Sequence, residues 1–199
     1  MNFSSLFFNK EVILKKKICV FGGSKSGKNS ENIKSAKTVG KIIAENNFDI
    51  VFGGGENGIM GSVSETAIKY GSKTTGIIPN FLIKKDIKET KHSNRFNTDL
   101  IITENMHQRK QMMYEKSDAF LILPGGVGTL DECFEVLTWC QLSQIVNKKI
   151  GIINFNNFWD PLIYLINHLI REEYMGSYNL NYYEELRNKN SLKFFLKNI

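Results

Sequence analysis

Apolar residues fall into two alternating patterns along this chain of 199 residues. Short apolar runs, several of them ending in glycine, alternate with longer stretches in which apolar residues recur at helical spacing. The runs predict strands at 17–23, 49–55, 74–79, 99–104, 119–126 and 149–155, and the longer stretches predict helices near 30–46, 57–70, 105–117, 128–144 and 157–173. Continuously apolar strands separated by helices are typical of an α/β fold with a parallel sheet covered on both faces.

Other segments fall outside this alternation. Residues 1–16 are expected to form an N-terminal extension, so that the domain itself spans 17–199. The polar segment 80–98 is too long for a plain connector and predicts a surface loop near the site. A Tyr- and Asn-rich segment follows residue 174, and 191–199 has the pattern of a short amphipathic helix.

Composition mainly narrows the class of protein. The chain is 42% apolar and 23% charged, which is ordinary for one globular domain. Its net charge of +6 comes from lysines spread along the sequence, which favours a solvated surface over a nucleic-acid-binding face. No apolar run approaches the ~18 residues that predict a membrane span, so no membrane partner is expected. The three cysteines lack CxxC spacing, which favours reduced thiols and a cytoplasmic protein.

The first glycine loop follows the first predicted strand and has the spacing of a phosphate-binding P-loop. Gly22, Gly27 and Lys28 match that motif, but Asn29 stands where it has a Ser or Thr that holds magnesium. This departure disfavours an NTPase. It leaves Ser24, at the strand end, as the residue better placed to bind a ligand, unless the glycines only form a tight turn.

The second glycine loop reads GGGENGIMG, and Gly53, Gly55 and Gly58 satisfy GxGxxG. A dinucleotide site also needs an acidic residue about 20 positions further on, and the next strand ends in Pro79 instead. A mononucleotide site that includes Gly54 and Gly55, or simple backbone packing, is therefore favoured over NAD binding. No cofactor is expected.

The third glycine loop, PGGVGTLDE, gives the strongest indication of a ligand site. An apolar strand runs into Gly125, Gly126 and Gly128, and Thr129 is expected to open the next helix. Free backbone amides, a helix N-terminus and a hydroxyl together form an anion site suited to a phosphate monoester. Such a site needs no metal.

Glu132 allows two interpretations. Thr129 and Glu132 have capping-box spacing, so the carboxylate can serve the helix start alone. The helical pattern also places Glu132 off the apolar face, and a carboxylate beside a phosphate site is electrostatically unfavourable, which favours a chemical role. Arg109 lies one helix and one strand earlier, where its guanidinium can pair with Glu132 or with the ligand. For Lys110 a solvated position is favoured, with ligand binding as the alternative.

Together these motifs resemble those of the Lonely guy (LOG) family of cytokinin riboside 5′-monophosphate phosphoribohydrolases, formerly mislabelled lysine decarboxylases. The family's PGGxGTxxE appears with its glutamate at Glu132, MHxRK appears with its arginine at Arg109, and GGGxxGxMG appears in the second loop. The resemblance covers about residues 17–173. The first loop and the tail after residue 174 depart from the family pattern.

The resemblance implies a doubly wound Rossmann-like fold in a single domain, and a homodimer with the site near the subunit interface. It implies hydrolysis of the N-glycosidic bond of a purine nucleoside 5′-monophosphate, either AMP or an N6-substituted AMP, with Arg109 and Glu132 as catalytic residues and without a metal. The residues predicted to bind the phosphate and the rest of the substrate are Gly125, Gly126, Gly128, Thr129, Ser24, Gly54, Gly55 and Lys110. A non-catalytic carrier of a nucleotide or of the molybdenum cofactor is the alternative on a related fold.

Overall fold

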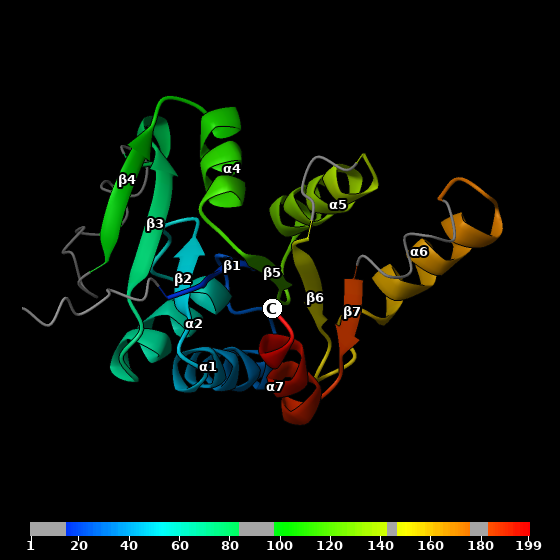
Figure 1. Ribbon diagram of the computed structural model, residues 1–199, viewed down its shortest axis with the longest axis horizontal. Helices are drawn as coiled ribbons and strands as arrows, with labels where there is room; N and C mark the ends of the chain where they lie inside the picture. Colours follow the sequence, from blue (N-terminus) through cyan, green and yellow to red (C-terminus); the bar gives the residue numbers. More distant parts are fainter. Residues whose placement is uncertain (1–14, 84–97, 143–146, 176–182) are drawn as a thin grey trace, which may run out of the picture.

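The computed structural model describes residues 15–83, 98–142, 147–175 and 183–199. They form a seven-stranded sheet in which all neighbouring strands are parallel, in the order β4-β3-β2-β1-β5-β6-β7 (Figure 1). The strands are β1 (Lys17–Phe21), β2 (Asp49–Phe52), β3 (Thr74–Pro79), β4 (Asp99–Thr103), β5 (Ala119–Ile122), β6 (Lys149–Ile153) and β7 (Tyr183–Leu186). The predicted parallel sheet is confirmed.

Helices cover both faces of this sheet. They are α1 (Ser30–Glu45), α2 (Gly58–Lys69), α4 (Met106–Glu115), α5 (Val127–Gln141), α6 (Asp160–Arg171) and α7 (Lys189–Lys197). One apolar cluster joins α1, α2 and α7 to one face, and a second joins α4, α5 and α6 to the other (Figure 1). The prediction of a single, doubly wound α/β domain is therefore confirmed.

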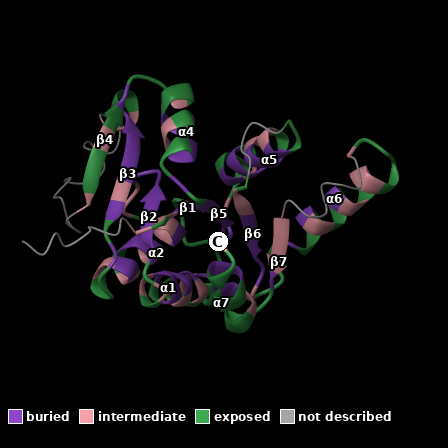
Figure 2. Ribbon diagram, in the orientation of Figure 1, coloured by how far each residue is buried: buried purple, intermediate pink, exposed green. Residues whose placement is uncertain are grey.

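Successive residues of the central strands enter opposite clusters. In β1, Ile18 and Val20 belong to the cluster under α1, α2 and α7, whereas Cys19 and Phe21 belong to the other cluster. Because neighbouring strand residues point to opposite faces and both faces are covered, a central strand is apolar throughout. Figure 2 shows the result, with buried residues concentrated in the central strands and on the inward sides of the helices.

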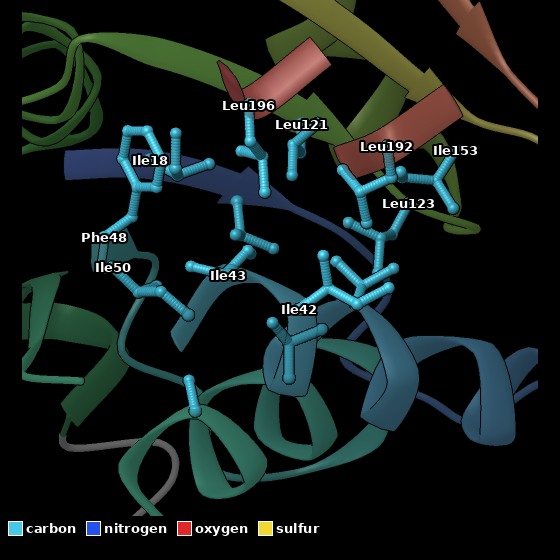
Figure 3. Packing of buried hydrophobic residues seen from close by; sticks show 14 of the residues in the cluster. Ile18, Ile42, Ile43, Phe48, Ile50, Leu121, Leu123, Ile153, Leu192 and Leu196 are labelled. Carbon is cyan, nitrogen blue, oxygen red and sulfur yellow. The ribbon is translucent and has the colours of Figure 1, made fainter. Parts of the chain in front are cut away.

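The C-terminal helix contributes to this core. Leu196 of α7 lies beside Leu121 and Leu192 lies beside Leu123 and Ile153, in the same cluster as Ile42 and Ile43 of α1 (Figure 3). The predicted terminal helix is thus present, but it begins at Lys189 rather than at residue 191. The earlier start follows from a capping box formed by Asn188 and Ser191.

One strand has no counterpart in the sequence pattern. β7 pairs in parallel with β6 at the edge of the sheet, and of its sequence YEEL only Leu186 is fully buried. An edge strand needs no continuous apolar run, because fewer neighbours cover it. Most of the predicted loop 80–98 lies outside the described residues. So do residues 1–14, and the domain boundary at residue 17 therefore stays a prediction.

The strand order reverses at the centre of the sheet. From β1 the chain proceeds through β2 and β3 to β4 at one edge, and then returns to β5 beside β1 and continues to β7. In open parallel sheets, ligands bind at the carboxyl ends of the strands next to such a reversal. The loops that follow β1 and β5 are the first and third glycine loops.

Candidate active site

The three glycine loops are bonded to one another at the carboxyl edge of the sheet. The Gly23 amide donates to the Pro124 carbonyl at 3.0 Å, and the Ile59 amide donates to the Gly23 carbonyl at 2.9 Å. Gly58 has a φ of +65°, and a Cβ there would lie only 2.5 Å from the backbone nitrogen of Lys25. The loops therefore form one tightly packed floor that tolerates no side chain at Gly58.

This floor bounds a cleft of about 420 Å³. The apolar side chains of Met60, Ile78 and Leu82 line one part of it. The residues predicted from sequence that line it are Ser24, Gly55, Arg109, Gly126, Gly128, Thr129 and Glu132. The structure thus brings together parts of all three loops and α4.

The N-terminus of α5 opens into the cleft. Gly126 is the N-cap residue and Val127 the first helical residue, so the helix begins two residues before the predicted start at Thr129. The amide of Leu130 donates to the Gly126 carbonyl, whereas the first amides of a helix have no acceptor within it. A Cβ at Gly126 or Gly128 would meet no atom within 4 Å. The helix start is therefore open on this side, and the binding of an anion there stays a prediction.

Glu132 lies on the buried side of α5. It is the sixth residue of the helix and Thr129 the third, so the capping-box interpretation is wrong. The expectation that Glu132 lies off the apolar face is also wrong, because its exposed fraction is only 7% and it shares the buried face of α5 with Cys133 and Val136. Residues at i and i+3 share one face of a helix, and this places Glu132 below the buried Thr129, towards the cleft.

The protonation of Glu132 is set by opposing effects. Burial raises the pKa of Glu132 to about 7. The positive charges of Arg109 and, less strongly, Lys110 oppose this rise, and the negative charges of Asp131 and Glu135 add to it. A carboxyl group with a pKa near neutrality, facing a cleft, is typical of acid–base catalysis.

Arg109 reaches Glu132 from the neighbouring helix, α4. Its Nη2 lies 3.6 Å from Oε1 of Glu132, and both side chains are about nine-tenths buried. This separation is that of an ion pair rather than of a hydrogen bond. The Nε–H of Arg109 donates to the Ile77 carbonyl at 3.2 Å, and Nη1 lies 3.7 Å from the sulfur of Met106. The guanidinium is therefore held by its own surroundings as well as by Glu132.

Lys110 is neither solvated nor part of the cleft lining. Its Nζ lies 2.6 Å from Glu135 and 3.2 Å from Asp131, and the side chain is largely buried between α4 and α5. Burial alone would lower the pKa of Lys110, but the bonds to Glu135 and Asp131 together raise it. The favoured expectation of a solvated lysine is therefore wrong, because the ammonium group bridges α4 to Asp131 and Glu135 of α5.

Two other residues predicted to bind the substrate lie at the margin of the cleft. Gly54 has a φ of +77° and packs against Ile78 of β3. Gly125 packs against Thr129 and borders a second cavity of about 250 Å³, which shares Ser24 and Gly126 with the cleft. Both glycines support the loops that form the site.

Several lining residues were not expected from the sequence. Met60, Ile78 and Leu82 are apolar, and Val127 is 84% exposed at the start of α5. An apolar residue that lines a cleft has the same pattern as one that fills a core, so single-sequence reasoning has no means to separate them.

Residues 15–83, 98–142, 147–175 and 183–199 contain no group of three or more His, Cys, Asp or Glu side chains arranged to hold a metal ion. Among the helices of these same ranges, none is long and apolar enough to cross a membrane.

Solved structures share the fold. The molybdenum cofactor carrier protein of Chlamydomonas reinhardtii superposes with a TM-score of 0.64 at 18% identity, covering 92% of this chain and 97% of that one. The molybdenum cofactor binding protein of Rippkaea orientalis gives a TM-score of 0.63 at 21% identity, covering 93% and 97%. At such identities the likeness concerns the fold alone.

Sequence relatives are more similar. A cytokinin riboside 5′-monophosphate phosphoribohydrolase of Arabidopsis thaliana is 39% identical over 162 residues, which cover 81% of this chain and 72% of the relative. A probable enzyme of the same name from Oryza sativa subsp. japonica is 37% identical over 161 residues, covering 81% and 62%. This chain thus spans slightly less than two thirds of the length of the rice relative.

A family model described as "Possible lysine decarboxylase" matches residues 60–193. The matched region includes the end of the second glycine loop and the whole of the third, together with Arg109 and Glu132. Because this match covers more than half of the chain, and because the Arabidopsis relative is aligned over most of its own length, the chain belongs to the LOG family.

Proposed function

We propose that this protein hydrolyses the N-glycosidic bond of a purine nucleoside 5′-monophosphate, releasing the free base and ribose 5-phosphate. The observation that carries the proposal is the buried pair of Arg109 and Glu132, which faces the same cleft as the open N-terminus of α5. The names of the relatives support this activity.

The start of α5 is the proposed phosphate site. A 5′-phosphate placed there accepts hydrogen bonds from free backbone amides and lies at the positive end of the helix dipole. Thr129 and Ser24 line the cleft beside this helix start and offer hydroxyl groups. Binding energy from the phosphate, remote from the scissile bond, then aligns the ribose.

Glu132 is the proposed catalytic carboxylate. Breakage of the bond between C1′ and the base nitrogen leaves the electron pair with the base and positive charge on the ribose. An ionised Glu132 stabilises that charge and orients water towards C1′. The water oxygen bonds to C1′ and one proton of that water passes to Glu132. The base nitrogen takes one proton from solvent and Glu132 releases its proton to solvent, so each turnover consumes one water and regenerates the carboxylate.

Arg109 is proposed to keep Glu132 ionised and oriented. Its positive charge opposes the rise in the Glu132 pKa that burial causes. It also places positive charge beside a cleft in which negative charge develops on the departing base.

The apolar part of the cleft is the proposed base site. Met60, Ile78 and Leu82 offer a surface on which adenine, or adenine with an apolar N6 substituent, can lie. AMP and N6-substituted AMP are therefore both proposed substrates. A homodimer and a cytoplasmic location are further proposals, and the resemblance to the family supports the first of them.

The test is incubation of the protein with AMP and with N6-isopentenyl-AMP, followed by chromatography for the free base and an assay for ribose 5-phosphate. We expect equal amounts of both products from at least one substrate, and none from adenosine, which lacks the phosphate. Binding of AMP without release of the free base from either nucleotide would contradict the proposal and favour a carrier.

A further inference from the structure

Gly53 lies against the guanidinium of Arg109. It directly follows β2 and lines the cleft. A Cβ built on Gly53 would overlap Nη2 of Arg109, and it would lie 3.1 Å from Cζ and 3.6 Å from Nε. The three nearest atoms all belong to this one side chain. The guanidinium of Arg109 therefore occupies the space that a side chain at position 53 would fill.

The backbone at this position does not itself require glycine. Gly54 and Gly58, in the same loop, have positive φ angles of +77° and +65°, which L side chains rarely adopt. Gly53 is not among the glycines with positive φ. Its conformation is open to alanine, and the only obstacle among its nearest neighbours is Arg109.

We propose that Gly53 is a positioning residue for the hydrolysis: it gives the Arg109 guanidinium the space in which it faces Glu132. This inference rests on the proposed function for its catalytic consequence. The geometry has three supports, namely the Ile77 carbonyl that accepts from Nε, the bare backbone of Gly53 beside Nη2, and the Glu132 carboxylate 3.6 Å from Nη2. A methyl group at position 53 removes the second support and displaces the guanidinium from the third.

The charge around Glu132 gives this displacement a measurable effect. Arg109 and Lys110 contribute positive charge from α4, and Asp131 and Glu135 contribute negative charge from α5 itself. The Cys19 thiol of β1 also interacts electrostatically with Glu132, and burial raises the pKa of that thiol, so it is uncharged. Arg109 is the stronger of the two cations that lower the Glu132 pKa. Moving its guanidinium away therefore raises that pKa.

The test compares Gly53→Ala, Arg109→Ala and the double variant. Because the obstructing atoms are the end of a flexible side chain, we expect Gly53→Ala to fold and its kcat to fall about tenfold or more with a smaller change in KM. The double variant should be no slower than Arg109→Ala, since Gly53 acts through Arg109. The proposal would be overturned if the loss of kcat in the double variant equalled the product of the losses in the two single variants. An unchanged kcat in Gly53→Ala would also overturn it. Arg187→Ala, an exposed arginine paired with Asp160 and Glu185, is the control for loss of an arginine.

A second readout does not depend on turnover. The pKa of Glu132, followed by carbon-13 NMR of the carboxyl group, should be higher in Gly53→Ala than in the wild type. An unchanged pKa would overturn the proposal even if the protein hydrolyses AMP. A raised pKa in a protein without hydrolase activity would support the placement of Arg109 while the proposed function fails.

A comparison of stability tests the proposal if Gly53→Ala fails to fold. If Gly53→Ala does not fold, the double variant with Arg109→Ala should fold as stably as Arg109→Ala alone, because the obstructing guanidinium is gone. A double variant that also fails to fold would show that Gly53 serves the backbone, and the proposal would be wrong.

Discussion

The ammonium group of Lys110 lies 2.6 Å from the Glu135 carboxylate, one helical turn beyond Glu132 on α5. The same ammonium contacts Asp131, and the Tyr114 hydroxyl donates to Glu135 at 2.7 Å. Two side chains of α4 thus hold the part of α5 that carries Glu132. This network links the two helices through residues that do not line the cleft, whereas Arg109 and Glu132 meet at the cleft itself.

Replacement of Lys110 by methionine is expected to shift the pH dependence of hydrolysis. Lys110 lowers the pKa of Glu132, whereas Asp131 and Glu135, which it neutralises, raise it. If the ionised carboxylate is the active form, kcat rises with pH through a value near 7, and the variant should show this rise at a pH higher by roughly half a unit. The measurement is a pH–kcat profile, with Lys116→Met at the exposed end of α4 as control. A shift to lower pH would contradict the assignment.

Substitution of Glu132 by glutamine separates a catalytic role from a structural one. Gln has nearly the same shape but is unable to carry negative charge or accept a proton. We expect the rate of base release to fall on the order of a hundredfold or more, while the circular dichroism spectrum is unchanged. Glu172→Gln, on the exposed surface of α6, is the matched control. Retention of most of the activity by the Glu132 variant would refute the proposed mechanism.

The sequence was sufficient for the parts of the fold that are buried on two faces. Central strands such as β1 and β5 are apolar throughout because each face of the sheet has its own helical layer. β7 is an edge strand with polar residues at three of four positions, and its pairing depends on contacts with β6 that are distant along the chain. The local sequence pattern therefore predicts the central strands but not the edge strand β7.

For the candidate site, the motifs predicted which residues lie together better than they predicted the surroundings of each residue. Arg109 and Glu132 are separated by 23 positions (132 − 109), and the sheet brings them together through β5. Spacing alone suggested that Thr129 and Glu132 form a capping box. The actual helix start at Val127 places both residues on the buried face of α5, and Gly125, just before that start, packs against Gly23 of the first loop. Such a tertiary constraint has no local sequence pattern.

The stability of the protein should depend on pH through Glu132. The folded-state pKa is about 7, above the ordinary value of 4.5, so between these values the folded state binds more protons than the unfolded state. The free energy of unfolding therefore falls as pH rises from about 4.5 to 7, by an amount on the order of 1–3 kcal/mol from this group. The loss is complete above the folded pKa.

Urea unfolding at several pH values measures this effect. In Glu132→Gln the decline between pH 5 and pH 8 should be smaller than in the wild type, because the group that titrates is absent. The comparison uses the slope with pH and not the absolute stability, since the variant also leaves Arg109 without its partner. Parallel curves for the two proteins would show that Glu132 has an ordinary pKa in the folded state.

Alanine substitutions at two adjacent glycines are expected to affect different properties, stability at one position and substrate binding at the other. A Cβ at Gly125 would overlap Oγ1 of Thr129 and lie 2.9 Å from the amide nitrogen of Gly23, so it separates the first and third loops. Gly125→Ala should destabilise the protein by about 1–3 kcal/mol. A Cβ at Gly126 meets no atom within 4 Å, and the φ of −104° is accessible to alanine. The free energy of unfolding of Gly126→Ala should therefore lie within about 0.5 kcal/mol of the wild-type value.

A kinetic effect is expected in Gly126→Ala. The methyl group of Gly126→Ala lies in the cleft beside the open amides of α5, where the phosphate is proposed to bind, and it should raise KM for AMP severalfold. Thermal unfolding of both variants and steady-state kinetics of Gly126→Ala are the measurements. Each variant adds a single methyl group, and the two positions are adjacent, so each variant serves as the control for the other. Equal losses of stability would show that the third loop is a single rigid unit, and an unchanged KM in Gly126→Ala would place the phosphate elsewhere.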